Sequence, residues 1–193
     1  MAYPTTANFK TWKGISGSGE DTQIGWDLEA AIALLEKSTG RKFISSSATR
    51  KFFGRAPWVG LRRRRLFFHE DNLTITTLTN GDLTVITATY YQLLGVVGHY
   101  HGLELLSGAP YRFAEGADGT LITVAGTWGY LDSDGNCPDL VFDAILQVCD
   151  VYYRARAQGI MGDIPGVSRQ GQSTAALEFP PILQRAIDLY KRV

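Results

Sequence analysis

The segment from Thr120 to Arg156 constrains the fold of this chain more than any other part of it. Residues 120–125 are an apolar strand candidate, and they lead into a corner of small and aromatic residues, Gly126-Thr-Trp-Gly-Tyr130. After a polar loop, Pro138 and Asp139 begin a long helix, because proline suits the first helical position and a carboxylate suits the positive helix end. The segment therefore predicts a scaffold that joins a sheet to a helix, with nothing in it that resembles a catalytic site.

The long helix is expected to span about 138–158. Its apolar stripe consists of Val141, Ala144, Ile145, Val148, Tyr152 and Ala155. Arg154 and Arg156 lie in the last turn, where cations are favourable, and Gly159 is a stop signal.

An N-terminal helix is predicted after the flexible glycine- and serine-rich residues 14–19. From about Asp21 the apolar residues recur at helical spacing, and either Asp21 or Thr22 is the expected N-cap. The stripe consists of Leu28, Ala31, Ile32 and Leu35, and Gly40 ends the helix.

A C-terminal helix of about 181–192 is predicted to begin at the Pro180-Pro181 pair. Its narrow apolar stripe consists of Ile182, Leu183, Ala186, Ile187 and Tyr190. Residues 159–172 before it are rich in glycine and have no periodic pattern, so they predict a mobile loop. A terminal helix tethered in this way either folds back onto its own core or reaches into a neighbour, and both alternatives are open.

Between these helices, residues of about 51–125 predict an antiparallel sheet of short strands. The strand candidates are Thr49–Gly54, Leu66–Phe68, Leu73–Leu78, Asp82–Ile86, Tyr90–Leu94, Leu103–Leu106 and Tyr111–Phe113. Asn80-Gly81 is a hairpin signal, so Asp82–Ile86 should return antiparallel to Leu73–Leu78. The predicted fold class is α+β, a helical bundle frame with this sheet inserted, within one domain of 193 residues.

Composition excludes several classes of protein. Lys plus Arg and Asp plus Glu both number 19, so no global charge attracts nucleic acid or an anionic membrane. The N-terminus lacks the pattern of a signal peptide and no apolar run is long enough to span a membrane, so we expect a soluble protein. Cys137 and Cys149 have neither metal-site nor disulfide-framework spacing, and we expect both to be reduced thiols.

One dense basic run stands out, formed by Arg62, Arg63, Arg64 and Arg65. Guanidinium groups match phosphate oxygens, so the run is a candidate for contact with phosphates or an acidic partner. Alternatively, an extended backbone would divide the four side chains between two faces and form a solvated strand edge that discourages unwanted pairing.

Two places in the sequence carry candidate metal ligands. His99 and His101 would face one side of a strand and, with His69, form a partial zinc site, but the sequence shows no further ligands. Residues 132–136 resemble part of a calcium loop, but Cys137 stands where such loops require glycine, and a polar turn explains them better. We expect no metal and no cofactor.

Nucleophilic catalysis has no support in the sequence. It contains no Gly-x-Ser-x-Gly elbow and no Cys and His pair in a recognisable frame, and the glycines of residues 14–19 lack the Lys-Ser/Thr of a phosphate loop. We therefore expect that the protein is not an enzyme.

The order of these elements resembles a known family, the phage head-to-tail connector proteins, which are adaptors beneath the portal of long-tailed double-stranded DNA phages and gene transfer agents. The resemblance covers about 21–193. It rests on Glu36–Phe43, Thr49–Gly54, Leu78–Asp82, Tyr90–Leu94, His101–Leu106, Ile122–Tyr130, Pro138–Leu140, Tyr152–Arg156, Pro180–Leu183 and Tyr190–Arg192.

The resemblance implies a structural protein of the virion neck. Before assembly, it would be located in the host cytoplasm. It would form a ring of twelve copies coaxial with the portal, and DNA would pass through the lumen without sequence-specific binding. Its partners would be the portal protein, other copies of itself, and a head-completion or tail-proximal neck protein.

Carried over to this chain, the resemblance makes residues 173–193 a portal-docking segment and residues 159–172 its hinge. The docking candidates are Phe179, Ile182, Leu183, Ala186, Ile187 and Tyr190, and the hinge glycines are Gly159, Gly162, Gly166 and Gly171. The Arg62–Arg65 run would then meet carboxylates on a neighbouring subunit or on the portal.

Two other functions remain as alternatives. A nucleic-acid-binding module would need the Arg62–Arg65 run on one surface with Phe67, Phe68 and Tyr100. A small metal-dependent enzyme would need the three histidines to converge on one ion.

Overall fold

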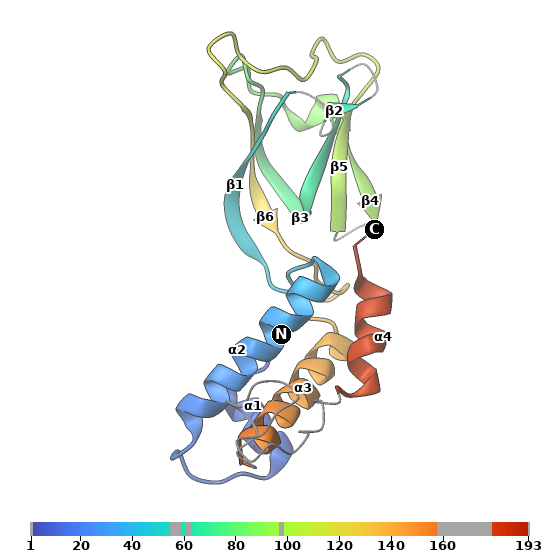
Figure 1. The fold of residues 1–193 in the computed structure, drawn as a ribbon. Coiled ribbons are helices and arrows are strands. Elements are labelled where there is room, and N and C mark those ends of the chain that lie inside the picture. Colours follow the sequence, from blue (N-terminus) through green and yellow to red (C-terminus); the bar gives the residue numbers. More distant parts are fainter. Residues whose placement is uncertain (1, 55–58, 61–62, 97–98, 158–178, 193) are drawn as a thin grey trace, which may run out of the picture. The chain divides into compact units, whose positions relative to one another are not determined.

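The computed structural model describes residues 2–54, 59–60, 63–96, 99–157 and 179–192 (Figure 1). The chain divides into two compact units, Met1–Arg41 with Cys137–Val193 and Lys42–Asn136. We call them the helical unit and the sheet unit. The fold is α+β with an antiparallel sheet inserted between the second and third helices, which confirms the predicted fold class.

Within its described residues, the helical unit contains α1 (Thr6–Lys13), α2 (Asp21–Thr39), α3 (Asp139–Ala157) and α4 (Pro181–Tyr190). Most residues of the predicted apolar stripes are buried in its core. The core consists of Phe9, Ile24, Leu28, Ala31, Leu35, Val141, Ala144, Ile145, Leu146, Val148, Cys149, Ala155, Leu183 and Ala186. None of the described helices is both long enough and apolar enough to cross a membrane.

Helix α1 was missed by the sequence prediction, because it is short and buries a single residue, Phe9. Local hydrogen bonds define its ends. The Thr5 hydroxyl accepts from the Asn8 backbone N–H at 3.3 Å and the Asn8 side chain accepts from the Thr5 N–H at 2.9 Å, which is a capping box. Gly14 ends the helix with a φ of 72°, which glycine adopts without strain.

The predicted N-cap of α2 was wrong. Asp21 is the first helical residue, and the N-cap is Glu20, whose side chain makes no capping hydrogen bond. Asp21 instead contacts the ammonium group of Lys10 on α1 at 2.7 Å. The Asp21 carboxylate, which the local pattern predicted as a cap, therefore forms an ion pair with a neighbouring helix.

The described strands of the sheet unit are β1 (Ser46–Phe52), β2 (Val59–Gly60), β3 (Arg65–Thr79), β4 (Tyr91–Val96), β5 (His99–Leu105) and β6 (Ile122–Trp128). All pairs are antiparallel, in the order β1-β6-β3-β5-β4, and β2 pairs with β3 outside this path. The core consists of Phe52, Leu66, Phe68, Leu78, Ile86, Leu103, Leu105, Ala109, Phe113, Ile122, Val124 and Trp128.

Strand β3 corrects the prediction of two short strands at Leu66–Phe68 and Leu73–Leu78. The structure joins them into one strand of 15 residues. Its first part pairs with β5 and its last part with β6, and the register with β5 shifts between Phe67 and Asn72. The sequence pattern appeared broken because β3 changes partners along its length.

The predicted hairpin at Asn80-Gly81 is also corrected. Residues 82–86 do not form a strand. They do return antiparallel as predicted, through an isolated bridge between Thr79 and Val85 and a hydrogen bond from the Ile86 N–H to the Leu78 carbonyl at 2.8 Å. The buried Asn80 side chain donates to the Arg112 carbonyl at 3.0 Å and accepts from the Ala114 N–H at 3.2 Å. These long-range hydrogen bonds hold the turn against residues 112–114, which are likewise not a strand.

The corner after β6 depends on glycines and on Trp128. A Cβ on Gly126 would lie 2.0 Å from the Thr74 carbonyl oxygen, so glycine lets β6 approach the irregular part of β3 closely. Gly129 has a φ of 137° and lies as close to Ile44. Trp128 is buried, and its indole N–H donates to the Ala48 carbonyl at 2.9 Å. The corner is therefore a packed part of the sheet core.

Candidate assembly surface

Two aspartates lie inside the helical unit, each paired with a base from another helix. Asp27 of α2 contacts Arg156 of α3 at 2.8 Å, and Asp150 of α3 contacts Lys13 of α1 at 2.6 Å. Arg154, one turn along α3, also contacts Asp150 at 2.8 Å. Because a buried carboxylate is costly unless paired, these contacts specify how α1 and α2 pack on α3.

The electrostatics of this cluster are consistent with a structural role. Burial raises the pKa of Asp27 above its ordinary value of 3.8, and the nearby Arg156 guanidinium opposes that rise. The same guanidinium lies 5.4 Å from the ring centre of Tyr153, whose hydroxyl donates to Glu20 at 2.7 Å. The charges therefore connect α2 and α3 to each other, as in an internal ion-pair network.

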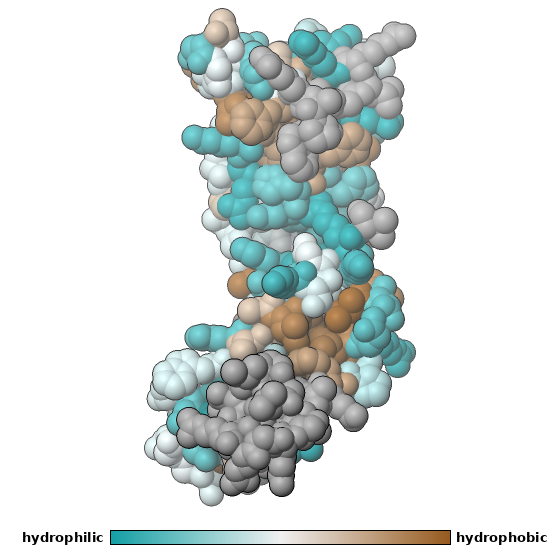
Figure 2. All heavy atoms as spheres, viewed as in Figure 1, coloured by the Kyte–Doolittle hydropathy of each residue, from teal (hydrophilic) through white to brown (hydrophobic). Residues whose placement is uncertain are grey.

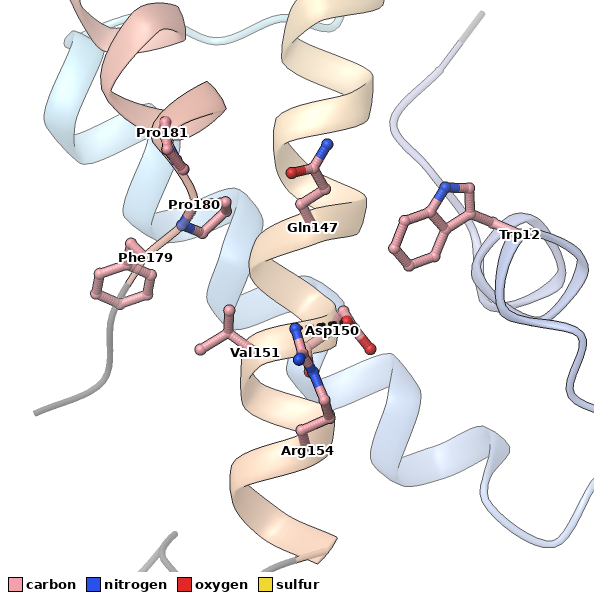
Figure 3. Close-up of a pocket in the computed structure, with 8 residues that line it drawn as sticks. All are labelled: Trp12, Gln147, Asp150, Val151, Arg154, Phe179, Pro180 and Pro181. Carbon is pink, nitrogen blue, oxygen red and sulfur yellow. Dashed lines mark hydrogen bonds and ion pairs between the residues drawn. The ribbon is translucent and has the colours of Figure 1, made fainter. Parts of the chain in front are cut away.

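A pocket of about 350 Å³ opens on the helical unit beside Asp150 (Figure 3). It is lined by Trp12 of α1, by Gln147, Asp150, Val151 and Arg154 of α3, and by Phe179, Pro180 and Pro181 where the chain enters α4. Figure 3 shows Trp12 on one side of α3 and the Phe179-Pro-Pro181 segment on the other. The pocket thus combines aromatic and proline walls with one guanidinium.

Large apolar side chains are exposed on the helical unit. Trp26 of α2 is 64% exposed, Leu189 of α4 is 65% exposed and Trp12 is 48% exposed. Single exposed apolar residues are common, but an exposed tryptophan offers a large contact area at little cost in side-chain entropy. Trp26 is therefore the strongest candidate contact residue on α2.

In the single chain, helix α4 packs on its own helical unit. Leu183 and Ala186 are buried, and Ile182, Ile187 and Tyr190 are half-buried. Phe179 packs edge-on against Tyr152 of α3 with ring centres 6.0 Å apart, and it remains 39% exposed.

Backbone contacts also hold the end of α4 to α2. The Arg41 side chain donates to the Tyr190 carbonyl at 2.7 Å, and the Arg192 N–H donates to the Thr39 carbonyl at 2.8 Å. Figure 2 shows apolar atoms gathered over α3 and α4, so the packed helix still contributes to an apolar surface. The predicted hinge glycines, Gly159, Gly162, Gly166 and Gly171, lie outside the described residues.

The arginine run does not act as one patch in the described residues. Arg64 donates to the Leu105 carbonyl at 3.0 Å, and Arg65 contacts both carboxylate oxygens of Glu104 on β5 at 3.0 and 3.2 Å. The same contact lowers the pKa of Glu104. Arg63 is exposed with a φ of 62°, and Arg62 lies outside the described part of the chain. Two of the four arginines are therefore used within the sheet unit.

The predicted metal candidates do not converge in the described residues. His99 stacks on Tyr130 with ring centres 4.4 Å apart, whereas His69 packs against Phe52. No group of three His, Cys, Asp or Glu side chains there is placed to hold a metal ion. Cys137 and Cys149 are both buried.

The calcium-like residues 132–136 form a polar turn. The Asp132 carboxylate accepts from the backbone N–H groups of Asp134 at 2.9 Å and Asn136 at 2.7 Å. Gly135 completes the turn with a φ of 75°. The carboxylate is thus occupied by its own backbone.

Sequence reasoning missed Trp12, Trp26, Asp27 and Asp150 as structurally informative residues. A partial signal existed for the aspartates, because each lies next to the apolar stripe of a predicted helix, where a carboxylate that becomes buried needs a partner. The pocket had no such signal, since it brings together α1, α3 and the start of α4.

No protein-family model matches the chain, and no curated protein matches it. The fold is similar to chains in three solved structures, each at 18% identity and over 97% of this chain. They are described as the neck of an empty GTA particle computed with C6 symmetry (TM-score 0.64, 89% of that chain), the neck of a native GTA particle computed with C12 symmetry (0.61, 88%), and the virion of a native gene transfer agent particle (0.62, 89%). At this identity, the likeness shows a shared fold.

Proposed function

We propose that this protein is a structural subunit of a virion neck, a head-to-tail adaptor that forms a ring beneath the portal. The observation that carries the proposal is the fold likeness to neck structures, which includes 97% of the chain and therefore both units. On this proposal the ring contains twelve copies and joins the DNA-filled capsid to the tail or to the next neck protein. Its role is structural and not enzymatic.

The charge distribution supports this role better than nucleic-acid binding. Lys plus Arg and Asp plus Glu balance at 19 each, and Arg64 and Arg65 are engaged within the sheet unit. A channel that DNA must traverse should not hold phosphates tightly, because every neutralised phosphate adds affinity through counterion release. Arg63, which is exposed, remains a candidate for contact with a partner's carboxylate.

For the portal, we propose docking through the α4 region, from Phe179 to Tyr190. Leu183 and Ala186 already pack within the helical unit, so the contact would use the apolar surface that α4 leaves exposed. Residues 159–172 are proposed as the hinge that precedes this segment.

Deletion of the gene from a particle-producing strain tests the neck role. We expect particles that package DNA but fail to join tails, and rescue by the gene supplied in trans. The measurement is the ratio of tailed to tailless DNA-filled particles by electron microscopy. Tailed particles in normal numbers after deletion would overturn the proposal.

A further inference from the structure

The exposed Trp26 and the Trp12–Arg154–Phe179 pocket lie on opposite sides of the helical unit. In α2, Ile24, Leu28 and Ala31 are buried, and Trp26 is two residues from Ile24, about 200° around a helix with 3.6 residues per turn. Trp26 therefore faces away from the core. In α3, Arg156 contacts Asp27 on α2, and Arg154, two residues earlier, lines the pocket. By the same geometry, the pocket side of α3 faces away from α2.

Two different surfaces on opposite sides of one unit suit a head-to-tail contact. In a closed ring of identical subunits, one patch of each copy meets a different patch of the next copy. We infer that Trp26 of one subunit inserts into the pocket lined by Trp12, Arg154 and Phe179 of the neighbouring copy in the ring. This inference rests on the proposed ring and names the contact that closes it.

The chemistry of the two surfaces is complementary. The aromatic and proline walls of the pocket suit an indole ring, and its volume of about 350 Å³ lies within the range of about 300–1,000 Å³ common for ligand pockets. The Arg154 side chain is 60% exposed although it contacts Asp150, so its guanidinium can also stack on an aromatic face.

Charge is complementary as well. Lys13, Arg154 and the buried Asp150 leave one excess positive charge beside the pocket. Glu29 is exposed, lies about one turn after Trp26 on the same face of α2, and has no hydrogen bond or ion pair to another described residue. A neighbouring copy that places Trp26 in the pocket would bring Glu29 toward Arg154.

The test uses the full chain with the photo-cross-linker p-benzoylphenylalanine in place of Trp26. This variant is co-expressed with the wild-type chain, and the particles that contain both are purified. Irradiation should give a dimer of this chain, with the cross-link in residues 147–154 or at Trp12 of the other copy by mass spectrometry. The same cross-linker at Gln147 should capture residues 23–29 of another copy. A cross-link to a different protein, a cross-link within one copy, or no product in particles that contain the chain overturns the inference and leaves the neck role standing.

Absence of the chain from tailed particles would instead overturn the neck role and this contact with it.

A second measurement uses Trp26→Ala, with Phe53→Ala as a matched control because Phe53 is an exposed aromatic residue of the sheet unit. We expect Trp26→Ala to lower incorporation into particles at least about tenfold, since tryptophans are common hot spots, and Phe53→Ala to leave it unchanged. Equal effects of the two substitutions, with both proteins folded by circular dichroism, would also overturn the inference.

Discussion

Single buried groups show how the helical unit is held together. Asp27, Asp150 and Cys149 all lie in the same core, so their electrostatic environments are linked. Burial, with a smaller contribution from the two carboxylates, raises the pKa of the Cys149 thiol from its ordinary value of 9.0 to about 12. This thiol stays protonated in the folded protein at neutral pH and is a poor nucleophile there.

The raised pKa of Cys149 predicts a loss of stability in alkali. The folded state keeps the thiol neutral up to about pH 12, whereas the unfolded state ionises it near pH 9. The stabilisation is thus complete below pH 9 and is lost as the pH rises toward 12. Between about pH 9 and pH 10 the free energy of unfolding should fall by about 1 kcal/mol on this account.

Urea denaturation at several pH values checks this loss, with Cys149→Ala as the control that lacks it. The difference between the two proteins isolates the thiol, because Tyr91, Tyr152 and Tyr153, whose pKa values are also raised, begin to contribute near pH 10 in both proteins. An identical pH dependence in wild type and Cys149→Ala would contradict the prediction.

At the level of elements, close backbone contacts matter more than intrinsic preference. Strand β3 continues through a region without regular pairing because it leaves β5 and joins β6. Gly126 of β6 lies where the two backbones come closest. A glycine that weakens an isolated strand is thus required by the neighbouring strand.

Two glycine substitutions should have opposite effects on stability. Gly126→Ala places a Cβ 2.0 Å from the Thr74 carbonyl oxygen and should destabilise the protein by about 2 kcal/mol or more. Gly25→Ala, inside α2 with nothing within 4 Å of the new Cβ, should stabilise it by about 0.5–1 kcal/mol. Chemical denaturation measures both, and a Gly126→Ala protein as stable as wild type would contradict the close contact.

Substitutions at a buried and at an exposed position of α4 should distinguish its role in folding from its role in portal docking. Leu183→Asp buries an unpaired carboxylate and should destabilise the helical unit by about 3 kcal/mol or more. Leu189→Asp changes an exposed position and should alter stability by less than about 0.5 kcal/mol. It should nevertheless weaken binding to portal rings at least about tenfold if the exposed side of α4 docks there.

Co-sedimentation with portal rings is the measurement. Wild-type binding by a folded Leu189→Asp protein would argue against docking through this side. Point substitutions are preferable to truncation here, because removal of α4 would also remove Leu183 and Ala186 from the core.

At the scale of the whole molecule, each unit has a hydrophobic core of its own. The ends of the sheet unit are also tied together, since the Tyr130 N–H donates to the Lys42 carbonyl at 2.7 Å. Residues 42–136 should therefore fold alone, with a cooperative thermal transition and a β-type circular dichroism spectrum.

Trp128→Ala in the same fragment is the control for that experiment. It removes the largest side chain of the core and the hydrogen bond to Ala48, and should destabilise the fragment by about 3–5 kcal/mol. A wild-type fragment without a cooperative transition would mean that the sheet unit depends on the helical unit.

The sequence alone determined the elements whose signals are local. The apolar stripe of α3, the glycine that ends α2 and the prolines that begin α4 act within a few residues, so spacing and side-chain type suffice to predict them. The same local signals gave the α+β class with an inserted sheet.

The tertiary structure decided the features that join residues distant in the sequence. Asp21 pairs with Lys10 instead of capping α2, and the Asn80 side chain bonds to residues 112–114, far from it in the sequence. The pocket beside Asp150 likewise exists only where α1, α3 and the start of α4 meet. Such contacts satisfy buried polar groups and exclude water from apolar surface, and those free energies depend on which segments become neighbours in space.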